Sequence, residues 1–297
     1  MPEENGGAVL RGGEFYSPVK ARLLADDVLL SELRPPCSCQ IPRHQHELAY
    51  VTVVLSGDYR EGNRGRMQDL HPFTAVFNPS GIEHATAIGP AGASLFTIEM
   101  RDEHLRQLAI RLPLQTEFDR GSGAMLWPAL RLYASFKTNT VEPLVRESDV
   151  LEMLGAIAGF TPSEKSTPRW LNRVKERMQE QLGDNLRMRE LADDAGVHPV
   201  HLARVFRFYE GHTPGSYFQR VRVRAACHQL RKQDYPLAII AAECGFADQS
   251  HFTRVFRKFT GNTPAQFRRM LAPHSLAPEL LSPRAISIRG HVQRDRR

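Results

Sequence analysis

The stretch CGFADQSHFTRVFRKFTGNTP, residues 244–264, has a counterpart in the same chain, AGVHPVHLARVFRFYEGHTP at residues 195–214. In each copy a glycine precedes a helical pattern, and a second glycine, followed two residues later by Thr-Pro, ends it. Glycine permits the positive φ that a tight turn between two helices needs. The repeat therefore predicts two helical hairpins.

The longer helix of each hairpin is predicted to bury one stripe. In the second copy Asp248 is a good N-cap, and the apolar residues that follow it recur at spacing i, i+3, i+4, i+7. In the first copy His198 takes the cap position and Pro199 follows at the favoured first helical position. The two expected stripes are Phe252, Val255, Phe256 and Phe259, and Leu202, Val205, Phe206 and Tyr209.

The face opposite each stripe is free to meet a partner, and it carries arginine in both copies. Such side chains can read base edges or hold phosphates. A short helix, a glycine turn and a second helix with a polar outer face form the helix-turn-helix plan. The alternative is a bundle of repeated hairpins without a ligand. The expected DNA-binding residues are Val200, Ala203, Arg204 and Arg207 in the first copy, and Gln249, Ser250, Arg254 and Arg257 in the second.

The segment SYFQRVRVRAACHQLRKQ, residues 216–233, joins the copies and is long enough for a continuous helix of about 27 Å. Such a helix could hold two reading helices roughly one DNA turn, about 34 Å, apart. The repeat would then let one monomer read two successive major grooves.

Charge is divided unevenly along the 297 residues. Residues 1–165 hold 16 basic and 21 acidic residues, a balance of −5, whereas residues 166–297 hold 23 basic and 12 acidic, a balance of +11. A basic half joined to an acidic half suggests that one half meets a polyanion, although a merely basic surface is the simpler reading. No apolar run of membrane-spanning length and no secretory signal is present, so we expect a cytoplasmic protein.

The rear half resembles the AraC/XylS family of bacterial transcription regulators over residues 170–271. The second copy, IAAECGFADQSHFTRVFRKFTGNTPAQFR at residues 240–268, follows that family's signature almost position by position. The resemblance implies base contacts from Arg204 in the first copy and from Gln249, Ser250 and Arg254 in the second. Val200 and Ala203, at matching positions, could touch only thymine methyl groups.

The front half contains short β-branched runs and two histidine motifs. His44 and His46 are two residues apart, so on a strand they share a face. About forty residues later PSGIEH supplies Pro79, Gly81 and His84. The two motifs resemble those of a cupin, a small β-barrel.

Cupins that hold a metal add a glutamate four or five residues after the second histidine, where this chain has Tyr50 and Val51. Three histidines alone could still hold zinc or iron. We instead expect His44, His46 and His84 to line an effector cavity, with no catalytic residue, no metal and no cofactor. Cys37 and Cys39 precede these histidines and could join a metal cluster or sense redox state, but a loop role is the preferred reading.

The sequence thus predicts a two-domain α+β protein. A cupin-like effector and dimerisation domain with a helical appendage covers residues 1–158, and a linker covers 159–168. A double helix-turn-helix domain covers 169–272, and a poorly ordered basic tail covers 273–297. We expect a dimer through residues 101–158, with the apolar stripe of Leu126, Leu130 and Tyr133 as its contact surface; the alternative is that this stripe packs inside one chain.

We interpret the chain as a sequence-specific transcription regulator that binds double-stranded DNA and a small-molecule effector, with RNA polymerase and a second copy as further candidate partners. One alternative is a cupin metalloenzyme, an oxygenase or isomerase, fused to a DNA-binding domain. Another is a ligand-independent DNA-binding protein whose barrel only dimerises. The sequence names neither the effector nor the operator.

Overall fold

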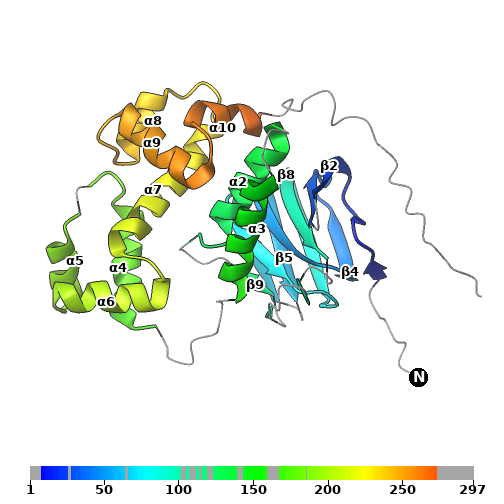
Figure 1. Cartoon of the computed structure of the whole chain (residues 1–297), viewed down its shortest axis with the longest axis horizontal. Helices are drawn as coiled ribbons and strands as arrows, with labels where there is room; N and C mark the ends of the chain where they lie inside the picture. Colours follow the sequence, from blue (N-terminus) through cyan, green and yellow to red (C-terminus); the bar gives the residue numbers. More distant parts are fainter. Residues whose placement is uncertain are drawn as a thin grey trace, which may run out of the picture.

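The computed structural model describes residues 8–25, 28–63, 66–101, 105–106, 112–113, 116–118, 123–138, 143–158, 167–184 and 186–272. A curled β-sheet forms the front half and a set of helices forms the rear half (Figure 1). This confirms the expected two-part α+β arrangement. Most of the expected linker and the whole expected tail, residues 273–297, lie outside the described residues.

The described strands belong to one sheet of order β1-β4-β8-β5-β7-β9, with β3 and β2 added beside β8 and β6 beside β5. All pairs are antiparallel except β1 with β4. The strands are β1 (Ala8–Leu10), β2 (Val19–Ala25), β3 (Val28–Leu33), β4 (Gln40–His46), β5 (Ala49–Asn63), β6 (Arg66–Leu70), β7 (Ala75–Asn78), β8 (His84–Met100) and β9 (Glu117–Phe118).

Side-chain alternation gives the sheet two different faces. On β5, Val51 and Val53 point into the main apolar core together with the helix α2 (Leu126–Thr138). Tyr50 and Thr52, one position away, line a small pocket on the opposite face. The same strands therefore support a helix on one side and a polar cavity on the other.

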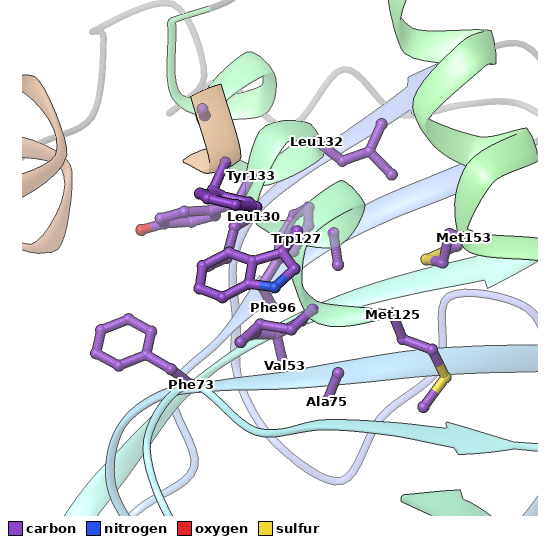
Figure 2. Packing of buried hydrophobic residues seen from close by; sticks show 14 of the residues in the cluster. Val53, Phe73, Ala75, Phe96, Met125, Trp127, Leu130, Leu132, Tyr133 and Met153 are labelled. Atoms are coloured by element: carbon purple, nitrogen blue, oxygen red, sulfur yellow. The ribbon is translucent and has the colours of Figure 1, made fainter. Parts of the chain in front are cut away.

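Helix α2 is buried almost throughout, and this corrects the predicted dimer surface. Leu126 and Leu130 are fully buried and Tyr133 is 2% exposed, all inside one chain. Tyr133 packs on Phe96 of β8 at 5.1 Å between ring centroids (Figure 2). Because this stripe is already covered by the sheet and by the rear half, it is not available to a second copy.

A buried ion pair also joins α2 to the sheet. Lys137 near the end of α2 donates to Glu32 of β3 at 3.0 Å, and both side chains are at most 2% exposed. The second helix of the appendage, α3 (Pro143–Ala158), packs beside α2 and is tied to it by Arg131, which bonds Asp149 at 2.6 Å.

The rear half consists of helices that form two hairpins joined by α7 (Figure 1). Helix α7 has 17 residues, about 26 Å at 1.5 Å per residue, as the sequence predicts. No helix in the described part of the chain is long and apolar enough to cross a bilayer. The helices are α4 (Arg169–Glu180), α5 (Met188–Ala195), α6 (Pro199–Glu210), α7 (Pro214–Leu230), α8 (Leu237–Glu243), α9 (Gln249–Thr260) and α10 (Pro264–Leu271).

The second hairpin shares its core with the front half. Phe259 of α9 meets Trp127 of α2 at 5.4 Å between ring centroids, and the Tyr133 hydroxyl donates to the Met270 carbonyl of α10. From the loop between β6 and β7, Phe73 lies edge-on to His228 of α7 at 5.2 Å. The two halves therefore meet across an apolar interface on the side of α9 and α10.

Candidate functional site

The second hairpin forms as its sequence predicts. Helix α8 ends before Gly245, whose φ of +75° makes the turn. Asp248 caps α9 by accepting from the backbone N–H of His251 at 2.7 Å. All four residues of the expected stripe are buried, from Phe252 to Phe259. Burial of this stripe fixes which face of α9 points outward.

The outward face of α9 borders a groove of about 860 Å³. Arg257 is exposed there, as is Arg254 one turn before it. Four expected DNA-binding residues thus come together, and three further residues join them. The lining residues are Gln249, Ser250, Thr253, Arg254, Arg257, Lys258 and Thr263. Lys258 could have been predicted from the sequence, because it lies in the last turn of α9 next to Arg257.

The first hairpin repeats the geometry with a different outer face. Gly196 makes the turn at φ +66°, and Nδ1 of His198 accepts from the backbone N–H of Val200 at 3.3 Å. Leu202 and Phe206 are buried, as expected. The rest of the stripe, Val205 and Tyr209, is only half-buried.

On the outer face of α6, Arg204 and Arg207 are exposed, Ala203 is half-buried and Val200 is 69% exposed. The expected residues of the first copy thus share one outward surface. They present two guanidinium groups and two apolar side chains.

In the front half, the three expected histidines converge. His44 on β4 lies directly opposite His84 on β8, and their ring centroids are 4.3 Å apart. His46 is stacked on His84 at 5.5 Å. One ligand atom from each ring lies within 4.8 Å of the others, and all three residues are buried. The backbone N–H of Gly81 donates to the His46 carbonyl at 2.9 Å, which holds the second motif against the first.

The pocket environment keeps two of these imidazoles neutral. Burial, reinforced by His84, lowers the pKa of His44 to about 4 and that of His46 to about 3. Nδ1 of His44 bonds the Pro42 carbonyl at 2.8 Å, so that nitrogen carries the proton and Nε2 is left as an acceptor. Within the part of the chain that the structure describes, Nδ1 of His46 is buried without a hydrogen-bond partner. The pocket therefore offers nitrogen acceptors to a hydrogen-bond donor.

Tyr50 occupies one of the two positions where a metal-binding cupin has glutamate. Its hydroxyl bonds Nε2 of His84 at 2.9 Å. Three imidazoles could supply nitrogen ligands to zinc or iron. Among the described residues, however, no carboxylate or thiolate joins the three-histidine group. A metal would also have to compete with Tyr50 for His84. Three imidazole nitrogen ligands and no anionic one from the described residues are thus available to a cation at this site.

The cavity between the rings measures only about 30 Å³, room for roughly one water molecule. Part of its wall is the segment before β2, residues 15–17. Phe15 lies 5.4 Å from His46 and Tyr16 lies 5.1 Å edge-on from His44, both between ring centroids. The cavity as it stands is too small for a ligand larger than about one water molecule, and these two rings form part of its wall.

Two buried carboxyl groups near the pocket were not found from the sequence. Glu61 accepts from the Tyr59 hydroxyl at 2.8 Å and from Asn78 at 2.6 Å. Burial raises the pKa of Glu99 to about 7, although the backbone N–H of Gly13 donates to it at 2.9 Å. Only strand register places these two residues beside the histidine motifs. Cys37 and Cys39 are free cysteines outside the histidine group.

Comparison with known proteins agrees with the geometry of the rear half. Residues 191–270 match the family model of a helix-turn-helix domain. The probable transcription factor PqrA of Proteus vulgaris is 34% identical over 90 residues, which are 30% of this chain and 74% of that protein. The chain belongs to the AraC family of transcriptional regulators.

Two further relatives differ in how much of each chain the match covers. The bifunctional transcriptional activator/DNA repair enzyme AdaA of Bacillus subtilis is 32% identical over 121 residues, 38% of this chain and 57% of AdaA. The uncharacterized HTH-type transcriptional regulator YpdC of Escherichia coli is 24% identical over 276 residues, 86% of this chain and 94% of YpdC. These relatives are named as transcription regulators, and one of them also as an enzyme.

Proposed function

We propose that this AraC-family protein is a sequence-specific regulator that contacts duplex DNA through the outer faces of α6 and α9 and takes a small effector in its histidine pocket. The observation that carries the proposal is the duplicated outer face. Each copy is fixed by a buried stripe and carries two exposed arginines at equivalent positions. The +11 balance of residues 166–297 supplies the long-range attraction to a polyanion.

Within this proposal Arg254 and Arg257 have different roles. Arg254 lies in the second turn of α9, where a guanidinium can make a bidentate contact to guanine. Arg257 lies a turn further along and would hold phosphate. Lys258 and Thr263, on the rim of the same groove, would add phosphate contacts.

The test starts from the full-length protein and a pool of random duplex DNA, from which bound sequences are selected. Arg254→Ala should cost about 1–3 kcal/mol on the selected site and relax the preference at one position. Arg257→Ala is the matched control, since it should weaken all sequences about equally. If the two variants show each other's expected result, α9 presents a different face to the major groove of DNA. Failure to select any sequence would contradict the proposal.

For the effector, the neutral imidazoles favour a small ligand that carries O–H or N–H donors. Entry would require the segment Phe15–Ser17 to move, because the present cavity holds about 30 Å³. An effector that prefers one arrangement of the two halves would shift DNA binding by its differential affinity. The contacts of Phe73 and Trp127 with the rear half offer a physical route for that coupling.

A thermal-shift screen of small polyols, amines and sugars with the full chain would test this pocket. His46→Ala should abolish the shift produced by any compound found, while the full chain still binds its selected DNA. Gln45→Ala, the next residue on β4, is the matched control and should keep the shift. Retention of stoichiometric zinc or iron that is lost in His46→Ala would instead assign a metal to the site.

We propose that the protein has no catalytic activity, because His44 and His46 are neutral and no carboxylate among the described residues joins the histidine group. The homodimer and the contact with RNA polymerase stay sequence-based predictions. A turnover of substrate that disappears in His46→Ala would contradict the non-enzymatic assignment.

A further inference from the structure

The outer face of α6 differs chemically from that of α9, although the two helices follow one plan. Val200 stands at the place that Ser250 takes in α9, and Ala203 stands at the place of Thr253. Near the end of the helix Phe208 replaces Lys258. The outer face of the first hairpin thus lacks two hydroxyl groups and one of the cations that border the groove of the second, while it keeps two arginines.

These apolar side chains are not part of the hairpin's core. Val200 and Phe208 are each 69% exposed, whereas Leu202 and Phe206 on the opposite side are fully buried. A single exposed apolar residue is common in proteins. Val200 and Ala203, however, share one surface with two exposed arginines, and Arg207 would hold that surface against the phosphates.

The geometry points to thymine as the partner of this surface. We propose that α6 reads DNA through the 5-methyl groups of thymine, with Val200 and Ala203 as the residues that contact them. This rests on the proposed DNA-binding function and deepens it. In the major groove only thymine presents a methyl group, so an apolar contact there distinguishes it from the other bases.

The position of Val200 on the helix supports this assignment. It is the second residue of α6, at the end that a recognition helix directs to the base edges. Its backbone N–H is occupied by Nδ1 of His198 at 3.3 Å. What Val200 offers to a base is therefore its methyl groups alone. Ala203 lies one turn further, beside Arg204 and Arg207.

The two hairpins would consequently use different chemistry on their half-sites. The α6 half-site is specified by thymine methyls, with Arg204 as its hydrogen-bonding residue. The α9 half-site is specified by hydrogen bonds from Gln249, Ser250 and Arg254.

The experiment uses the full-length protein and the duplex selected from random DNA. Selections repeated with Arg204→Ala and Arg254→Ala assign each half-site to its helix. Each thymine is then replaced singly by deoxyuridine, which removes the methyl group and keeps the pairing edge. Each contacted methyl in the α6 half-site should cost about fourfold in affinity, the factor expected for one buried methyl group.

A double-mutant cycle makes the test specific to the residue. In Val200→Ala, the thymine and deoxyuridine duplexes should bind with nearly equal affinity at one thymine position, because the methyl contact is already lost. Ser250→Ala at the equivalent place in α9 is the matched control and should leave that penalty unchanged. A bound duplex insensitive to deoxyuridine throughout the α6 half-site would overturn the inference alone. Failure to select any duplex would overturn it together with the proposed function.

Discussion

The two hairpins of the rear half follow one sequence plan, yet they differ in what covers them. In the second hairpin Phe259 is 6% exposed because Trp127 of α2 packs against it. In the first hairpin the equivalent residue, Tyr209, is half-buried and lies edge-on to the exposed Phe208. The second hairpin is therefore built into the core of the front half, and the first is held mainly by the helices around it.

This difference shows how one repeated motif can serve two purposes. The second hairpin joins a polar, cationic groove to the interface with the pocket half. The first hairpin, α5 and α6, packs in a separate apolar cluster with α4 and the start of α7. A change in the front half would thus reach α9 by direct packing contact, whereas the apolar residues of α6 belong to a cluster that is separate from the front-half core.

The largest expected effect is a difference in stability between variants in the apolar stripes of α9 and α6. Phe259→Ala should lower the free energy of unfolding by about 3–5 kcal/mol, since it empties a site between α9 and α2. Tyr209→Ala should cost less than about 2 kcal/mol, because that side chain is already partly in water. Urea unfolding of the two full-length variants measures both values. Equal losses of unfolding free energy in the two variants would mean that Phe259 and Tyr209 are buried to the same extent.

The turn glycines give a second matched pair. A Cβ on Gly245 would lie 2.0 Å from the Leu182 carbonyl oxygen, whereas a Cβ on Gly196 meets nothing within 4 Å. Both residues have positive φ, so both alanine variants are strained by about 1–2 kcal/mol. Gly245→Ala adds overpacking and should cost about 2–5 kcal/mol in total. Comparable melting temperatures for the two variants would refute the close packing of the second turn.

The smallest expected effect is a change in the free energy of unfolding with pH. Burial, reinforced by Arg231 and Arg224, lowers the pKa of His228 to about 4, below the ordinary value of 6.5. The unfolded chain therefore binds more protons between these values, and stability falls as pH drops from about 6.5 to about 4. His44 and His46 act in the same direction, while Glu99, with its raised pKa, acts against them.

Replacing His228 should isolate its share of this pH dependence. His228→Gln should flatten the slope of unfolding free energy against pH by up to about 1.4 kcal/mol per pH unit. His212→Gln, in the loop between α6 and α7, should also flatten it, because burial lowers the pKa of His212 in the same direction. Urea titrations from pH 4.5 to 7 provide the slopes, and an unchanged slope in His228→Gln would exclude a buried neutral imidazole there.

Local signals in the sequence were enough to predict the hairpins, their caps and their outer faces. The Gly turns, the cap at Asp248 and the convergence of His44 with His84 all depend on spacings of a few residues or on strand alternation. Which residues pack against α2 could not be predicted in this way. Its apolar stripe indicates that something packs there, but Phe259 and Met270 are more than a hundred residues away.

The size of the pocket and the hydrogen bond of Tyr50 could not be predicted for a related reason. Tyr50 was known to replace a glutamate, but its bond to His84 depends on how β5 lies beside β8. The cavity of about 30 Å³ depends on Phe15 and Tyr16, which carry no motif. Tertiary placement therefore decided the size of the site, while local sequence decided its chemistry.

The salt dependence of binding tests the central claim most directly. Affinity of the full-length protein for its selected duplex would be measured from about 50 to 200 mM salt. The account predicts a linear fall of log K with log salt, with a slope near −0.9 for each phosphate contacted, and a shallower slope by about one such step in Arg257→Ala. Binding that ignores salt, or a slope that is the same in Arg257→Ala, would contradict the assignment of the α9 face to the DNA backbone and groove.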